Sequence, residues 1–278
     1  MQFKHSHLKY LLQAATLVPA HASPAVLRNA TGHGQYPTRE IAGVAVIDTP
    51  IVRAAHDLAY EYSVSYLYKH VMRSWLFGTL ILTNNASLSA TIDPEVHAVS
   101  ALLHDLGVAE GSPFISTDKR FEVDGAIAAR EFVSNYTVAH SGAEKKWDQI
   151  NQQLVWDSIA LHAQPSIATY KEPVVATTSD GILIDFYGPD HGVTQAQYNA
   201  VLAEFPRDGF LSGFNHTLLW LAQTKPNTTI ENVGNADNWS ADTWQQPWGD
   251  YFVDGFSAIG QRVFDLIAGV HYKLIESR

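Results

Sequence analysis

The stretch Ala101-Leu102-Leu103-His104-Asp105-Leu106-Gly107 places an imidazole next to a carboxylate directly after an apolar run. The run ends a segment with helical periodicity, which begins with Asp93 as the capping residue and Pro94 at the first helical position. We expect a buried helix that Gly107 terminates. Burying an adjacent imidazole and carboxylate is costly, and a divalent cation bound by both side chains would offset that cost. His104 and Asp105 are therefore the first candidate metal ligands.

The composition limits the chemistry that the rest of the chain can offer. The chain has 278 residues, 46% of them hydrophobic and 17% charged, which is typical of a soluble globular protein with a substantial core. It contains no cysteine, so disulfides, cysteine-based zinc sites, iron–sulfur clusters and thiol nucleophiles are excluded, and any metal must be held by His and carboxylate side chains. The formal charge is −10 and no Lys/Arg cluster occurs, so nucleic acid is not an expected partner.

Helical patterns lie on both sides of the His-Asp pair, and no segment shows sustained strand alternation or an internal repeat. The expected fold class is all-α, with one compact helical domain at 46–278 after an extended lead-in at 23–45. An irregular stretch is expected at 225–248. Besides the helix that ends at Gly107, helices are expected at 50–69, 70–83, 122–135, 143–163, 173–187, 194–204, 208–222 and 250–275.

The N-terminus resembles a secretory signal peptide. Basic residues precede an apolar run from Tyr10 to Val18, and Ala20-His21-Ala22 has the small-x-small form of a cleavage site. The run is too short to span a membrane. We therefore predict a signal peptide at 1–22, with an amphipathic N-terminal arm as the alternative.

The Asn-x-Ser/Thr pattern occurs more often than this composition gives by chance. Together with the N-terminus, the excess favours a secreted glycoprotein that passes through a eukaryotic secretory pathway. The alternative is that polar loops are simply rich in these residue types. The predicted glycosylation sites are Asn29, Asn85, Asn135, Asn215, Asn227 and Asn238.

A His on one helix, a His-Asp pair on a later helix and an Asp on a still later helix resemble the HD-domain metal hydrolase superfamily. In this chain the set is His70, then His104 and Asp105, then Asp185. Asp180 competes with Asp185 for the last position, but the apolar residues before Asp185 and Gly188 after it match the superfamily better.

Further motifs resemble one branch of that superfamily, the cyanamide hydratase-like HD proteins of fungi. The resemblance covers about residues 50–225. Its motifs are Arg73 with Phe77-Gly78, Leu102-Leu103-His104-Asp105-Leu106-Gly107, Phe121-Glu122-Val123 with Gly125, Leu161-His162, Asp185 with Gly188, and Phe205-Pro206-Arg207.

The resemblance implies an HD-type helical bundle that binds one divalent metal. The four ligands would be His70, His104, Asp105 and Asp185, the metal Zn²⁺ or alternatively Fe²⁺, and open positions would remain for water and substrate. Zinc is favoured for a secreted protein because it has no redox chemistry. Glu122 and Arg73 are the expected substrate-binding residues.

Two departures from the superfamily pattern bear on the reaction. Phe121 stands where two-metal relatives carry a further His, so a single metal is expected. His162 is then available for acid–base work or substrate contact, the alternative being a structural core histidine. Val108 stands where many phosphohydrolase relatives have a Lys, so a phosphate anchor is missing at that position.

These features favour a metal-dependent hydro-lyase that adds water to a small nitrile-like molecule, in the manner of cyanamide conversion to urea. Asp105 or His162 would be the catalytic proton acceptor. The first alternative is a single-metal phosphohydrolase of small phosphate esters. The second is a secreted, non-catalytic HD scaffold that binds a small ligand or a partner. Homo-oligomer formation is left open by the sequence.

Overall fold

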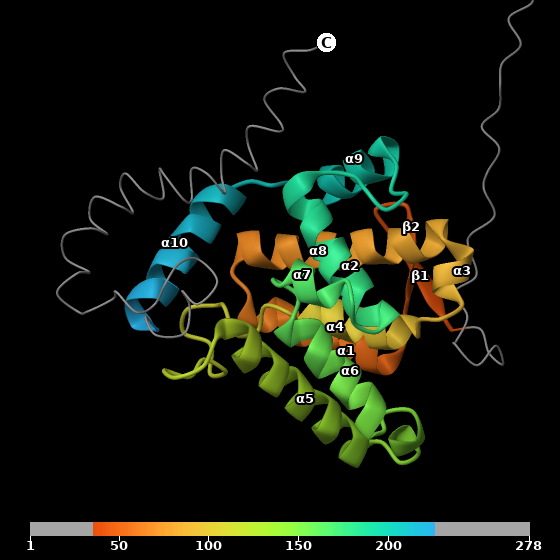
Figure 1. Ribbon diagram of the computed structural model, residues 1–278, viewed down its shortest axis with the longest axis horizontal. Coiled ribbons are helices and arrows are strands. Elements are labelled where there is room, and N and C mark those ends of the chain that lie inside the picture. Colours follow the sequence, from red (N-terminus) through yellow and green to blue (C-terminus); the bar gives the residue numbers. More distant parts are fainter. Residues whose placement is uncertain (1–35, 226–278) are drawn as a thin grey trace, which may run out of the picture.

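The computed structural model describes residues 36–225, apart from the side chains of residues 219 and 222, and this part of the chain is mostly helical (Figure 1). The all-α fold class is confirmed. The described elements are β1 (Thr38–Ile41), β2 (Val44–Ile47), α1 (Pro50–Tyr62), α2 (Ser65–Asn84), α3 (Ala86–Ser89), α4 (Pro94–Leu103), α5 (Phe121–Ala139), the short 3₁₀ helix η1 (Ala143–Lys145), α6 (Gln149–Ala160), α7 (Pro165–Ala168), α8 (Pro173–Tyr187), α9 (Gln195–Glu204) and α10 (Phe210–Thr224).

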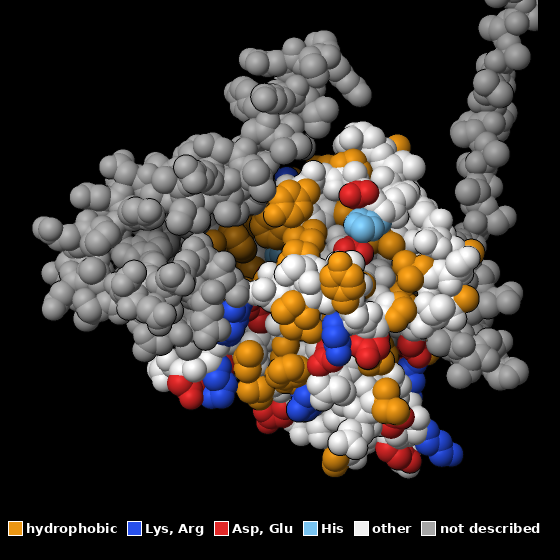
Figure 2. All heavy atoms as spheres, in the orientation of Figure 1, with side chains coloured by type: hydrophobic (Ala, Val, Ile, Leu, Met, Phe, Trp, Pro, Cys, Tyr) orange, Lys and Arg blue, Asp and Glu red, His pale blue; other side chains and the backbone are white. Residues whose placement is uncertain are grey.

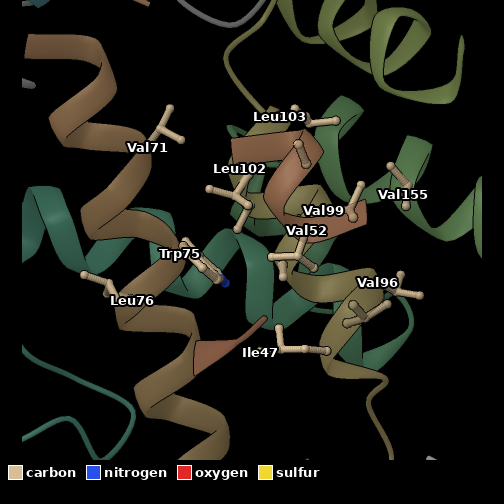
Figure 3. Close-up of a cluster of buried hydrophobic side chains, with 14 of the residues drawn as sticks. Ile47, Val52, Val71, Trp75, Leu76, Val96, Val99, Leu102, Leu103 and Val155 are labelled. Atoms are coloured by element: carbon tan, nitrogen blue, oxygen red, sulfur yellow. The ribbon is translucent and has the colours of Figure 1, made fainter. Parts of the chain in front are cut away.

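The bundle is built in layers around α2. Helices α4 and α8 pack on α2, α6 packs on both of these, and α5 pairs with α6 on the outer side (Figure 1). The core between the layers is apolar, and Trp75 of α2 and Leu102 of α4 are both fully buried in it (Figure 3). The apolar face of each helix therefore packs against the apolar side chains of the next layer.

Helices α2 and α8 approach each other closely at two glycines. A Cβ atom at Gly181 would lie only 2.7 Å from the backbone nitrogen of Gly78, so no larger residue fits there without displacing a helix. His70 lies about two turns before Gly78, and Asp185 lies about one turn after Gly181. This crossing brings His70 and Asp185 together although 115 positions separate them in the chain.

The helix that carries the His-Asp pair begins as expected and ends earlier. Asp93 caps α4 by accepting a hydrogen bond from the backbone N–H of Glu95 at 2.9 Å. The helix ends at Leu103, and Gly107 does not terminate it. A Cβ atom at Gly107 would instead clash with the backbone of Phe121 and Gly125, so this glycine lets the turn after α4 lie directly on the start of α5.

Two other expectations need correction. The helical pattern through 50–69 is broken at Ser63 and Val64, which are extended, so α2 begins at Ser65 and not at residue 70. Part of the expected lead-in is a β-hairpin, in which Ala42 and Gly43 both have positive φ, as a two-residue type I′ turn requires. Its second strand is buried against the helices, so the folded unit begins before residue 46.

Several predictions concern parts of the chain outside the described residues. These are the signal peptide at 1–22, the first part of the lead-in, the irregular stretch at 225–248 except its first residue, the helix at 250–275, and the glycosylation sites Asn29, Asn227 and Asn238. Between residues 36 and 225, no helix has the length and apolar character needed to cross a membrane. On the face drawn in Figure 2, basic side chains are scattered among acidic ones and form no continuous patch.

Candidate metal centre

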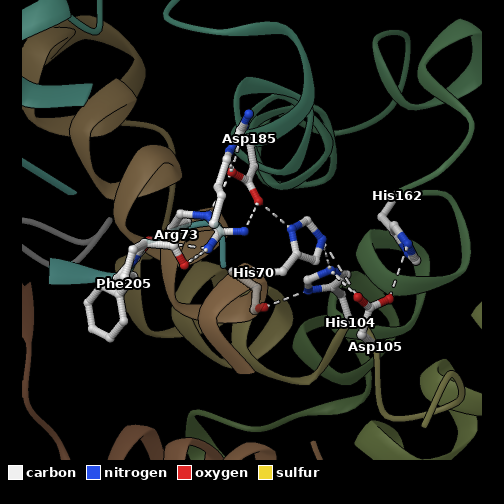
Figure 4. A network of polar contacts seen from close by, with 10 residues as sticks. His70, Arg73, His104, Asp105, His162, Asp185 and Phe205 are labelled. Atoms are coloured by element: carbon white, nitrogen blue, oxygen red, sulfur yellow. Dashed lines mark hydrogen bonds and ion pairs between the residues drawn. The ribbon is translucent and has the colours of Figure 1, made fainter. Parts of the chain in front are cut away.

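The polar side chains singled out by sequence meet where several helices end. His104 and Asp105 directly follow α4, His162 follows α6, and Asp185 lies in the last turn of α8, while His70 projects from α2 (Figure 4). All five are buried. Helix C-termini carry partial negative charge from their unpaired carbonyl groups, so this position favours a cation.

Three of these residues form a compact group. The Nε2 atoms of His70 and His104 lie 3.3 Å apart, and the Oδ2 atom of Asp105 lies 3.6 Å from the first and 3.1 Å from the second. Among residues 36–225, this is the group of His and carboxylate side chains that could hold a metal ion, with all ligand atoms within 4.8 Å of one another.

Each of the two imidazoles forms a hydrogen bond through Nδ1, which leaves its Nε2 atom free to bind a metal. His104 donates from Nδ1 to the carbonyl oxygen of Ala101 at 2.8 Å, and His70 donates from Nδ1 to Asp185 Oδ2 at 2.7 Å. In the neutral state each ring then has an unprotonated Nε2, and the two lone pairs face each other. A cation between them removes this repulsion, and such outer hydrogen bonds are the usual support of metal-binding histidines.

The spacing also suits a tetrahedral metal. For metal–ligand bonds of about 2.0–2.1 Å, two ligand atoms of a tetrahedral site lie about 3.3 Å apart. The observed separations of 3.1, 3.3 and 3.6 Å scatter around that value. The donor set of two imidazoles and one carboxylate therefore fits a divalent ion such as zinc.

The charges of His104 and Asp105 are coupled. Burial alone would raise the pKa of the Asp105 carboxyl, but attraction to His104 outweighs it and lowers that pKa. Burial alone would lower the pKa of His104, and attraction to Asp105 outweighs it and raises that pKa. The site is therefore held together electrostatically, and a divalent ion would take the place of the proton on His104.

Asp185 lies beside His70 but outside the three-residue group. Its carboxylate also accepts hydrogen bonds from Nε and Nη2 of Arg73, both at 2.7 Å, as one fork. Arg73 is fully buried and donates from Nη1 to the carbonyl oxygens of Phe205 and Pro206. Arg73, predicted to bind substrate, is therefore engaged with Asp185 and the backbone in this structure.

Arg207 is a further member of the site and was not among the residues predicted from the sequence to take part in its chemistry. It donates from Nε and Nη2 to Asp185 Oδ1 at 3.2 and 2.9 Å, and its side chain is 31% exposed. The available signal was the Phe205-Pro206-Arg207 motif, which carries no chemistry in isolation. Its partner, Asp185, lies 22 positions earlier in the chain.

His162 faces the other oxygen of Asp105. Its Nε2 lies 3.8 Å from Asp105 Oδ1, while its Nδ1 donates to the carbonyl oxygen of Ile159 at 2.7 Å. Burial, with repulsion from His104, lowers the pKa of His162 to about 4. The imidazole is thus neutral near pH 7, with an unprotonated Nε2 directed at the site.

Glu122 lies at the start of α5 and is almost completely buried. Arg120 pairs with its carboxylate, and Glu122 also acts electrostatically on His162. Asp124, two residues further along α5, forms a buried ion pair with Lys225, which follows α10. The predicted substrate-binding residue Glu122 is therefore close to the site but already paired.

The walls of the site are largely aromatic. The rings of Phe186 and Phe210 lie 5.2 and 5.3 Å from the ring of His70, and Phe214 packs on both. On the other side, the ring of Phe121 lies 5.7 Å from that of His162. Phe121 thus occupies the neighbourhood of the site without supplying a ligand atom.

Two other residues with metal-binding side chains, His97 and Asp180, lie away from the site. His97 packs against Gly78 and contacts Thr178 Oγ1 at 3.2 Å in the core between α2, α4 and α8. Asp180 pairs with His191 at 3.6 Å on a partly exposed part of α8. Neither belongs to the metal-binding group.

The chain matches no protein-family model, and no curated protein shows significant similarity to it.

Proposed function

We propose that this protein binds one divalent metal ion through His70, His104 and Asp105 and uses it to add water to a small, neutral, nitrile-like substrate. The observation that carries the proposal is the buried triangle of ligand atoms, in which each imidazole already donates from Nδ1 and presents Nε2. Zinc is our first choice and Fe²⁺ the alternative. Three protein ligands leave a coordination position open, as in catalytic zinc sites.

Zinc at such a site supplies Lewis acidity and lowers the pKa of a coordinated water toward 7. The chain itself must then move one proton. His162 is suited to accept it, because its Nε2 is unprotonated and lies 3.8 Å from Asp105 Oδ1. Asp105 orients the site with one oxygen toward the ligand triangle and the other toward His162.

The proton balance suits the hydration of a nitrile. Water oxygen forms a bond to the nitrile carbon while one carbon–nitrogen π bond opens, and one water proton passes by way of His162 to the electron pair freed on the nitrile nitrogen. With cyanamide the product is isourea, which tautomerises to urea. No group leaves the substrate, so no further acid is required.

The charge distribution favours a neutral substrate over a phosphate ester. Stabilising a transferred phosphoryl group requires additional metals or cationic clamps. In the described part of the chain, the cationic side chains around the site are all engaged in ion pairs with carboxylates, and two of them share one carboxylate. The pairs are Arg73 and Arg207 with Asp185, Arg120 with Glu122, and Lys225 with Asp124.

The resemblance to the cyanamide hydratase-like branch of the HD superfamily supports the same substrate class. The relationship to this branch is itself part of our proposal. The secretory route and the glycosylation inferred from the sequence are proposals as well. Secretion is unusual for a protein that would detoxify cyanamide, and another small nitrile or an isocyanide would fit the same chemistry.

Urea release from cyanamide by zinc-reconstituted protein tests the proposal. We expect turnover by the wild type, a loss of at least about 100-fold in His162→Asn, and unchanged turnover in His140→Asn, a matched variant at the exposed end of α5. Phosphate release from nucleotides without urea release would overturn the proposal in favour of a phosphohydrolase. Metal binding with neither activity would overturn it in favour of a ligand-binding scaffold.

A further inference from the structure

The carboxylate of Asp185 is fully occupied by donors from the chain. Oδ1 accepts from Nε of Arg73 at 2.7 Å and from Nε and Nη2 of Arg207 at 3.2 and 2.9 Å. Oδ2 accepts from Nη2 of Arg73 and from Nδ1 of His70, both at 2.7 Å. A carboxylate offers about four lone-pair positions, and these five contacts use them all.

A metal ion has no favourable approach to this carboxylate. Two guanidinium groups oppose one buried negative charge, so a cation added at Asp185 would meet a surplus of positive charge. Donation from His70 Nδ1 to Asp185 also keeps the lone pair of this ring at Nε2, which is the atom that faces His104. The contacts of Asp185 thus fix the orientation and the tautomer of His70.

We propose that Asp185 is the carboxylate that orients His70 and not a metal ligand, and that Arg207 is a positioning residue that holds Asp185 in this role. The inference rests on the metal site of the proposed function and is independent of the substrate. It replaces the expectation from the sequence that Asp185 is the fourth ligand.

Arg207 supports His70 in two ways. Besides its two hydrogen bonds to Asp185, its guanidinium lies 5.8 Å from the ring centre of Phe210, and that ring lies 5.3 Å from the ring of His70. The carboxylate and one aromatic neighbour of His70 are therefore both held by the connection between α9 and α10.

Arg207 is also the member of this cluster that can be changed most safely. Arg73 is fully buried, and removing it would leave a buried carboxylate short of its main partner. Arg207 is 31% exposed, and its replacement leaves the fork between Arg73 and Asp185 in place. An effect of Arg207 on the metal site can therefore be separated from a failure to fold.

The experiment measures Zn²⁺ binding to the metal-free full chain by competition with a chromophoric chelator, for the wild type, Arg207→Gln, Arg207→Lys and Arg130→Gln. Arg130 is the matched control, because it lies on α5 against Trp156 and Gln153, away from the site. We expect zinc affinity to fall about 10-fold in Arg207→Gln, less in Arg207→Lys, and not at all in Arg130→Gln. Circular dichroism and thermal melting check that each variant folds.

The tautomer of His70 gives a second readout without metal. In ¹⁵N NMR spectra of the metal-free protein, assigned with His70→Gln, we expect Nδ1 of His70 to be protonated and Nε2 unprotonated, and the Nε2–H tautomer to gain population in Arg207→Gln. If Asp185 were a direct ligand, removing a competing guanidinium would leave zinc affinity unchanged or raise it. That outcome, with an unchanged tautomer, overturns this inference alone. A wild-type protein that binds no zinc overturns the metal site itself and the inference with it.

Discussion

The Nε2 atoms of His70 and His104 lie 3.3 Å apart in the interior, although each ring already donates a hydrogen bond from Nδ1. Both atoms face Oδ2 of Asp105. Without a metal ion, one of the two rings must carry a second proton, on Nε2, so that it can donate a hydrogen bond to the Nε2 atom of the other ring. A bound metal would satisfy all three ligand atoms at once, so metal content should be visible in the stability of the fold.

Zinc should stabilise the wild-type protein. At free zinc 100-fold above the dissociation constant, the expected gain is about 2.7 kcal/mol, or a rise in Tm of roughly 5–10 °C. The rise should be reversed by a chelator and lost in His104→Gln, while Asp180→Ala should retain it. Differential scanning calorimetry with and without zinc makes the measurement. A zinc response that survives in His104→Gln would place the metal elsewhere.

His97 should make the metal-free protein lose stability as the pH falls below 6.5. Burial lowers the pKa of His97 to about 4 from 6.5, so between these values the unfolded chain takes up a proton that the folded chain does not. The cost is about 2 kcal/mol at pH 5. His162 contributes with the same sign, since burial lowers its pKa to about 4 as well. Above pH 6.5 neither histidine contributes.

Urea titrations at pH 7 and pH 5 check this dependence. His97→Leu should be less stable than the wild type at pH 7, because Thr178 Oγ1 loses a contact, but its stability should change less between the two pH values. An equal pH dependence in His97→Leu and the wild type would show that His97 is not held neutral by the core.

Gly181→Ala should destabilise the protein strongly. The added methyl group would lie 2.7 Å from the backbone nitrogen of Gly78 and 2.9 Å from the carbonyl oxygen of Ser74, so α2 and α8 must separate. We expect a loss of about 2–3 kcal/mol, with Asp180→Ala on the same helix costing at most about 1 kcal/mol. Chemical denaturation gives both values. Because this crossing aligns His70 with Asp185, zinc affinity should fall in Gly181→Ala as well.

The three described glycosylation motifs differ in accessibility. Asn85 and Asn135 are exposed. Asn215 is only partly exposed, and Thr217, which completes its motif, is buried and bonded to Tyr66. If the chain is expressed through a eukaryotic secretory pathway, folded protein should carry glycans at Asn85 and Asn135 and none at Asn215. Glycopeptide mass spectrometry checks this, and a glycan at Asn215 in folded protein would contradict it.

Local sequence was sufficient for the helical class and for the pair His104 and Asp105. Helix periodicity and capping by Asp93 act between near neighbours, so they can be read along the chain. The same reasoning misplaced the end of α4. Gly107 looked like a helix stop, whereas its actual constraint is the close approach of α5, a contact with residues 14 and more positions away.

Tertiary structure decided which side chains contact the buried carboxylate of Asp185. His70 meets Asp185 across 115 positions, and Arg207 joins them from the connection before α10. His97 and Asp180 have the same ligand chemistry as the site residues but lie away from the ligand triangle. Residue type shows which side chains can bind a metal or pair with a charge. Which of them do so depends on helix crossings such as that of Gly78 with Gly181, because burial and distance set the strength of each interaction.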